Sequence, residues 1–186
     1  MGAETGYIMS KAKTRCVHIF PRFENNFKIE EIRKKYDNLY CCIEPHITLV
    51  FPFESNLETE KLSEHINNTL ESVIPFRLIA SGIEGVDKHG CYLFLKIGEG
   101  KEKIIKLHYK MHEGILSKYQ SPWTKDGFYI PHITVGRFET QDQMRQAAIN
   151  LKDFKMEFRT IVDRIYIEEI GENEESIIEK VIKFGK

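Results

Sequence analysis

The stretch PHITLVFPF (residues 45–53) contains a four-residue word, Pro-His-Ile-Thr, that the chain repeats in PHITVGRF (residues 131–138). The two copies lie 86 residues apart in a chain of 186 residues. Proline biases the residue before it toward extended backbone, and the residues after it are rich in strand formers. Both stretches therefore predict short β-strands.

The segments around the two copies follow the same order, which indicates an internal duplication. Each copy is preceded by a strand and a helix, and is followed by a helix and a strand that opens with Phe-Arg, at Phe76-Arg77 and Phe158-Arg159. Outside the copies we predict strands at 14–21, 75–86, 91–98, 156–170 and 176–184, and helices at 27–40, from a cap at 55 or 56 to 73, at 101–119 and at 140–151.

This order predicts an α+β fold of two pseudo-symmetric lobes. We expect mainly antiparallel sheets, helices on the outside and a central cleft lined by the paired PHIT strands. The last strand is expected to cross over and extend the other lobe.

The composition predicts a single soluble domain. Of the 186 residues 41% are hydrophobic, and we expect residues 13–186 to form one bilobal domain after a disordered start at 1–12. The 27 basic and 28 acidic residues balance, so no overall field draws the chain to a nucleic-acid duplex or a membrane.

The longest apolar runs are shorter than the ~20 residues of a membrane span. Four cysteines without a CxxC pair, and without a secretory leader before them, indicate reduced thiols, and we expect a cytoplasmic monomer.

The repeated His-x-Thr pattern suggests a site for a phosphodiester. Side chains alternate along a strand, so His46 and Thr48 share one face, as do His132 and Thr134. If the lobes face each other, two imidazoles and two hydroxyls converge. Cleaving a phosphodiester needs a base at the attacking oxygen and an acid at the leaving oxygen, and histidine serves as either near neutral pH. The threonine hydroxyls can bond the non-bridging oxygens, and the scheme requires neither a metal nor a cofactor.

The two motifs resemble those of the 2H phosphoesterases, a family named for two His-x-Thr/Ser motifs, one in each lobe of a duplicated α+β fold. PHITLVFPF is similar to the first motif of the bacterial 2′-5′ RNA ligase branch, and PHITVGRF to the second, in which members often place arginine at the position of Arg137. The resemblance covers nearly the whole chain. It implies metal- and ATP-independent hydrolysis of a 2′,3′-cyclic phosphate on a nucleotide or an RNA end, and the reverse joining of RNA ends through a 2′-5′ bond.

Residues near the second motif are further candidates for the site. Arg137 would point away from the motif by strict alternation, but a β-bulge at Gly136 would turn it toward the phosphate. Phe128 shares the parity of the motif and could stack on a base, as could Tyr129 or Trp123 in the same loop. Ordinary packing is the competing interpretation for each of these aromatic residues.

Other polar residues are expected to be structural or solvated. Arg77 and Arg159 occupy matching positions in the two copies and could add positive charge, but we expect them to be exposed. His108 and His112 have the spacing of two metal ligands on a helix, yet without a complete HExxH pattern they predict a partly solvated helix face. The charge run EEIRKK (30–35) is also expected at the surface.

Two other functions remain open beside the phosphodiesterase. A binding module could keep the same cup of side chains and recognise RNA ends or a phosphorylated small ligand without turnover. Metal-dependent hydrolysis through His108 and His112 would instead be abolished by a chelator.

Overall fold

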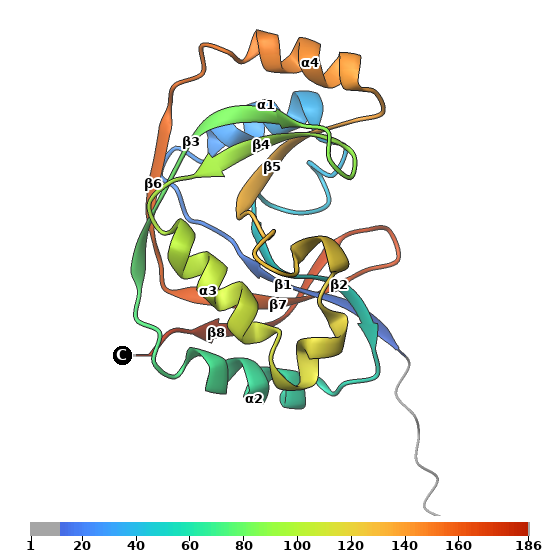
Figure 1. Cartoon of the computed structure of the whole chain (residues 1–186), viewed down its shortest axis with the longest axis vertical. Coiled ribbons are helices and arrows are strands. Elements are labelled where there is room, and N and C mark those ends of the chain that lie inside the picture. Colours follow the sequence, from blue (N-terminus) through green and yellow to red (C-terminus); the bar gives the residue numbers. More distant parts are fainter. Residues whose placement is uncertain (1–11, 186) are drawn as a thin grey trace, which may run out of the picture.

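The computed structural model describes residues 12–185, which form two four-stranded sheets (Figure 1). The predicted disordered start lies outside the described residues, apart from residue 12. Sheet A has the strand order β2-β1-β7-β8 and sheet B the order β5-β4-β3-β6, and every neighbouring pair is antiparallel. The strands of sheet A are β1 (Lys13–Ile19), β2 (Ile47–Ser55), β7 (Arg164–Ile170) and β8 (Ser176–Lys183). Those of sheet B are β3 (Phe76–Val86), β4 (Cys91–Ile97), β5 (His132–Phe138) and β6 (Glu157–Val162). The predicted α+β fold with antiparallel sheets is confirmed.

Helices are exchanged between the two halves of the chain. α1 (Phe27–Tyr36) follows β1 of sheet A but packs on β5 of sheet B, whereas α3 (Lys101–Met111) follows β4 of sheet B but packs on β2 of sheet A. α2 (Thr59–Leu70) contacts β8, and α4 (Gln141–Asn150) contacts β3, β4 and β5. We call sheet A with α2 and α3 lobe A, and sheet B with α1 and α4 lobe B; lobe A is the lower one in Figure 1.

The duplication is visible within sheet B. β3 and β6 pair antiparallel, and Leu78 lies opposite Thr160. Thr160 follows Leu78 by 82 residues, which is also the spacing of the two Phe-Arg pairs, so these two residues are counterparts. The approximate two-fold axis therefore passes between them. Buried apolar side chains from both lobes form a single cluster.

Several predicted elements were too long. The helix predicted at 27–40 ends at Tyr36, and the helix predicted from 55 or 56 to 73 spans Thr59–Leu70. Two further differences have a clear physical cause. The strand predicted at 156–170 is interrupted at Asp163, because β6 pairs with β3 in sheet B while β7 pairs with β1 in sheet A. The helix predicted at 101–119 ends at Met111, because Gly114 adopts a left-handed φ of 56°. Two 3₁₀ turns follow it, η1 (Gly114–Tyr119) and η2 (Pro122–Thr124).

The last strand behaves as predicted, since β8 adds to the sheet that carries the first PHIT strand. Within residues 12–185, no helix combines the length and the hydropathy needed to cross a bilayer.

Candidate active site

The two motif histidines are held by the same backbone contact. His46 precedes β2 directly, and His132 is the first residue of β5. In each ring Nδ1 lies near the carbonyl oxygen two residues earlier, at 2.8 Å for His46 and Glu44 and at 2.7 Å for His132 and Ile130. Because a carbonyl only accepts, Nδ1 donates, and in the neutral ring Nε2 keeps a free lone pair. Both rings thus offer the same atom for proton transfer.

Each PHIT strand contains a β-bulge directly after its threonine. The extra residue is Leu49 in β2 and Val135 in β5, 86 residues apart like the motifs themselves. A bulge shifts the alternation of side chains by one residue. Arg137 therefore lies on the same face of β5 as Thr134, the arrangement that we made conditional on a bulge at Gly136.

Asp37 holds Arg137 in place, and sequence reasoning missed it. The Asp37 side chain is 2% exposed, and its carboxylate accepts hydrogen bonds from Nε of Arg137 at 3.1 Å and from Nε of Arg33 at 2.9 Å. The backbone N–H of Leu39 donates to the same carboxylate at 3.1 Å. Two guanidinium groups are therefore fixed around one buried carboxylate.

The prediction that EEIRKK is a solvated surface is wrong for Arg33, whose side chain is 1% exposed. The reason is its place on α1, where it continues the buried stripe formed by Ile29 and Ile32. An arginine at an apolar position of a helical pattern is the signal that could have identified it, because a buried guanidinium requires partners.

Both motif histidines lie within the field of Arg137. Burial lowers the pKa of His132 to about 4, and the charge of Arg137 acts in the same direction. Burial is also the main cause that holds the pKa of His46 well below its usual range, with added contributions from the charges of His18, Arg33 and Arg137. Both rings are therefore neutral at pH 7 in the free protein. β2 and β5, the strands that carry the two motifs, contact each other across the lobes.

Side chains from the second half of the chain hold β2, an edge strand of sheet A. The Tyr129 hydroxyl donates to the Thr48 carbonyl at 2.8 Å, and Nδ1 of His108 donates to the Leu49 carbonyl at 2.7 Å. The two rings stack with centroids 3.8 Å apart. Tyr129 is only 3% exposed, which removes it as a surface for base stacking.

The prediction that His108 and His112 form a partly solvated helix face is wrong. Their exposed fractions are 0% and 6%, because α3 turns this face toward β2. Nδ1 of His112 donates to the His108 carbonyl at 2.7 Å. Burial lowers the pKa of His108 to about 4 and also lowers that of His112. The pair therefore packs as neutral rings that anchor the edge strand.

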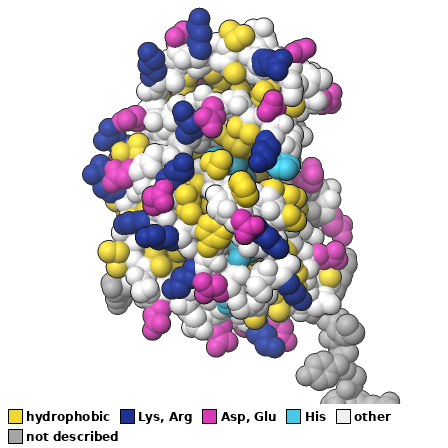
Figure 2. All heavy atoms as spheres, in the orientation of Figure 1, with side chains coloured by type: hydrophobic (Ala, Val, Ile, Leu, Met, Phe, Trp, Pro, Cys, Tyr) yellow, Lys and Arg dark blue, Asp and Glu magenta, His cyan; other side chains and the backbone are white. Residues whose placement is uncertain are grey.

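Two of the aromatic candidates remain at the surface. Phe128 is 62% exposed and Trp123 is 51% exposed. Residues of the β3–β4 turn contact both of them: Nζ of Lys88 lies 5.3 Å from the Phe128 ring centre, and the His89 ring lies 5.9 Å from that of Trp123. Figure 2 shows hydrophobic side chains gathered in the middle of this face, over the segment between α3 and β5.

Arg77 and Arg159 are exposed as predicted, with 61% of each side chain accessible. Each pairs with a nearby glutamate, Glu99 and Glu157 respectively.

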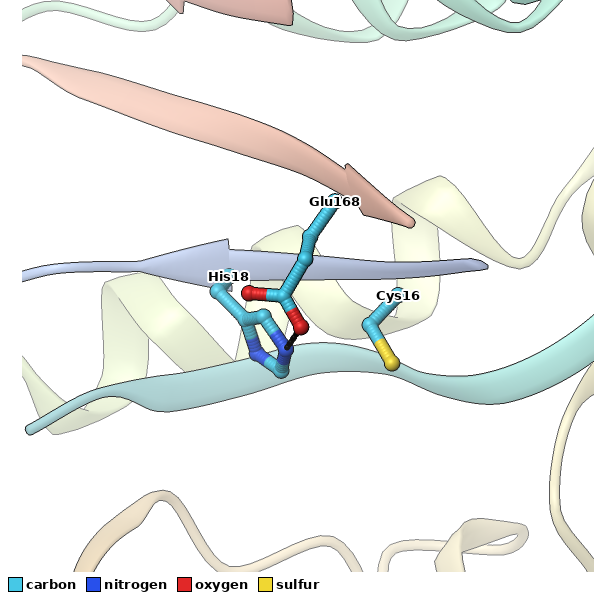
Figure 3. Close-up of side chains that lie close together, drawn as sticks. All are labelled: Cys16, His18 and Glu168. Atoms are coloured by element: carbon cyan, nitrogen blue, oxygen red, sulfur yellow. Dashed lines mark ion pairs between the residues drawn. The ribbon is translucent and has the colours of Figure 1, made fainter. Parts of the chain in front are cut away.

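Within the described chain, one group of side chains has donor atoms close enough to share a metal ion: Cys16, His18 and Glu168 lie within 4.8 Å of one another (Figure 3). Nε2 of His18 faces Glu168 at 3.6 Å, and the Ser176 hydroxyl donates to the other oxygen of that carboxylate. Burial and the Glu168 charge raise the pKa of the Cys16 thiol, whereas a metal ligand must be a thiolate. The three side chains are thus buried together as a polar cluster.

The structure has a duplicated α+β fold with one His-x-Thr strand in each lobe. This is the arrangement of the 2H phosphoesterases, the class that the sequence resembles. The chain belongs to the 2′-5′ RNA ligase superfamily, whose sequence profile it matches over residues 20–174. It is 26% identical to a "Putative phosphoesterase" of Geobacillus kaustophilus over 150 residues, which are 80% of this chain and 83% of that protein. It is 27% identical to a protein of the same description from Halalkalibacterium halodurans over 173 residues, 91% of this chain and 96% of the relative.

Solved structures share the fold. E. coli LigT complexed with 3′-AMP superposes with a TM-score of 0.64 at 15% identity, over 95% of this chain and 100% of LigT. TT0787 of Thermus thermophilus gives a TM-score of 0.62 at 14% identity, over 92% of this chain and 97% of that protein. At such identities the likeness establishes the fold alone.

Proposed function

We propose that the protein is a phosphodiesterase that hydrolyses 2′,3′-cyclic phosphates of nucleotides or RNA ends through His46 and His132, without a metal or cofactor. The observation that carries the proposal is the pair of equivalently held rings, each with a free Nε2 and each within the field of Arg137. One Nε2 would take a proton from the attacking water, while the other would give a proton to the ribose oxygen that leaves. Each such transfer is commonly worth about 10²–10⁴ in rate.

Binding of the substrate would favour protonation of one of the two rings. Both rings are neutral in the free protein, but a bound phosphodiester anion favours an imidazolium beside it and so raises the pKa of the ring that must act as acid. Arg137 would bind the non-bridging oxygens through its two terminal NH₂ groups, since Asp37 already occupies its Nε. The hydroxyls of Thr48 and Thr134 would donate to the same oxygens as negative charge develops on them.

A nucleotide-like substrate is supported by two observations. E. coli LigT, which shares the fold, has been solved in complexes with 3′-AMP, ATP and NADP+. In this chain Phe128 offers an exposed ring on the loop that leads into β5, where a base could stack. Reversal of the hydrolytic step with an RNA hydroxyl in place of water would join two ends through a 2′-5′ bond.

The test is turnover by the purified protein. We expect hydrolysis of 2′,3′-cyclic mononucleotides and of RNA that ends in a cyclic phosphate, with an unchanged rate in the presence of a chelator. His46→Ala and His132→Ala should each lose about 10²–10⁴ of the rate, whereas His89→Ala, in the exposed β3–β4 turn, should keep it. Chromatography assigns the product phosphate to the 2′ or 3′ position. Tight nucleotide binding without turnover would instead support a binding module, and loss of activity with a chelator would support metal-dependent hydrolysis.

A further inference from the structure

A second polar cluster lies against His46, on the same side of sheet A. It consists of Cys16 and His18 on β1 and Glu168 on β7 (Figure 3), and each of the three is at most 3% exposed. Nδ1 of His18 has no hydrogen-bond partner within residues 12–185. Burying polar groups in this way costs stability, so packing alone does not account for the cluster.

The duplication provides an internal comparison for His18. His18 pairs with Thr48 in sheet A, and Phe94 pairs with Thr134 in sheet B. The two threonines are counterparts in the repeated motif, so Phe94 is the counterpart of His18. Lobe B therefore places an apolar ring where lobe A places an imidazole.

The other members of the cluster also have counterparts in lobe B that differ in chemistry. Glu168 pairs with Cys16 in sheet A, and at the corresponding place in sheet B Val86 pairs with Tyr92. Val86 precedes Glu168 by 82 residues, the spacing that relates the strands across the two-fold axis. The same local structure is thus built without a buried carboxylate in lobe B, and the polar cluster is not demanded by the fold.

The cluster touches one catalytic candidate and has no equivalent beside the other within the described residues. The ring centroids of His18 and His46 are 4.5 Å apart with an interplanar angle of 61°. The ring of His132 instead stacks on Phe94, with centroids 3.5 Å apart and an angle of 17°. His46 therefore has a neighbour that can carry a charge, whereas the corresponding neighbour of His132 cannot.

We propose that His18 and Glu168 form a positioning pair that makes His46 chemically different from His132, so that each motif histidine has one fixed role in proton transfer. Nε2 of His18 faces the Glu168 carboxylate at 3.6 Å, and positive charge on His18 opposes protonation of His46. The inference rests on the proposed function. It adds that the roles of the two rings in hydrolysis cannot be interchanged, because the rings do not accept protons with equal ease.

The other groups around these rings act differently. Arg33 from α1 and Arg137 from β5 also place positive charge near His46, and Phe20 adds an apolar ring at 6.0 Å. Among the charges that lower the pKa of His46, that of His18 contributes most, while the charge that lowers the pKa of His132 is that of Arg137. Arg137 is thus common to both rings.

The titratable groups that face His18 come from β1, from β7 and from His46, which directly precedes β2. Glu168 lies 3.6 Å from its Nε2, and Tyr166 is its strand partner on β7. Cys16 on β1 has a raised thiol pKa and contributes no charge at neutral pH. Glu168 is therefore the anion that pairs with this ring.

The test is an NMR titration of the two motif histidines in the full-length protein. His18→Phe copies lobe B into lobe A, and it should raise the pKa of His46 by about 1 while that of His132 stays unchanged. In the pH profile of kcat/KM, only one limb should move, and that limb identifies the role of His46. An unchanged His46 pKa in a folded variant would overturn the proposal, as would equal movement of both limbs.

Glu168→Gln separates the proposal from a direct effect of Glu168 on His46, because the two explanations predict opposite shifts in the pKa of His46. If Glu168 acted on His46 directly, its removal would lower the pKa of His46. We expect the pKa of His46 to rise instead, because His18 loses the anion that its Nε2 faces at 3.6 Å. Phe94→Leu is the control in lobe B, since it removes the ring beside His132 without altering charge and should leave the titration of His46 as in the wild type. The titration needs no substrate, so it decides the role of this pair even if no cyclic phosphate is turned over.

Discussion

The buried ring of His108 makes the stability of this protein sensitive to acid. Its folded-state pKa of about 4 lies below the value of about 6.5 expected in the unfolded chain, so the unfolded state binds the proton first. The stabilisation is complete above pH 6.5 and is lost as the pH falls toward 4. At 1.36 kcal/mol for each pKa unit, we expect this one ring to cause a loss of about 2 kcal/mol at pH 5 and about 3 kcal/mol near pH 4.

The assay is urea unfolding at pH 7 and pH 5 for the wild type and for His108→Gln. Glutamine keeps an N–H donor for the Leu49 carbonyl but does not titrate. The variant should be less stable at pH 7, because the stack on Tyr129 is lost, yet the drop in unfolding free energy between the two pH values should be about 2 kcal/mol smaller than in the wild type. His89→Gln is the matched control in an exposed turn and should follow the wild type. An equal pH-dependent drop in wild type and His108→Gln would refute the reasoning.

Two further substitutions test contacts of the candidate site. Asp37→Asn removes the carboxylate that holds Arg137, and we expect KM for a cyclic mononucleotide to rise about tenfold to a hundredfold with a smaller change in kcat. The unfolding free energy should fall by roughly 3 kcal/mol. Steady-state kinetics and urea titration measure the two effects, and an unchanged KM would contradict this role. Tyr129→Phe deletes the hydrogen bond to the Thr48 carbonyl, which should cost about 1 kcal/mol, visible as a lower urea midpoint, and a midpoint equal to that of the wild type would show that the bond contributes nothing.

Local patterns predicted those parts of the structure that depend on neighbours in sequence. Proline followed by strand formers marked both motif strands, and alternation placed each histidine and threonine on one face. A bulge was considered only at Gly136, as a condition for Arg137; the structure places it at Val135, and the bulge at Leu49 was not foreseen, because a bulge depends on how the partner strand is paired. The strand partners of β6 and β7 were likewise set by distant segments, so the interruption at Asp163 left no clear mark in the local sequence.

Buried polar residues were the main failure. Arg33, His108 and His112 all carry side chains that are usually solvated, and nothing in their immediate sequence shows which carbonyl or carboxylate will accept from them. Their partners come from other elements or later in the chain: Asp37 for the arginine and the Leu49 carbonyl for His108. Periodicity placed these residues on a helix, but only the tertiary packing of α1 on β5 and of α3 on β2 decides that this helix face is covered.

The exchange of helices between the halves affects whether either half of the chain can fold by itself. α1 covers the sheet built mainly from the second half, and α3 covers an edge strand of the first. A protein cut in the turn between β3 and β4 would give two fragments, each lacking a helix that shields its own strands from water. Neither piece should become structured by itself, yet mixing them should regenerate a native complex by fragment complementation.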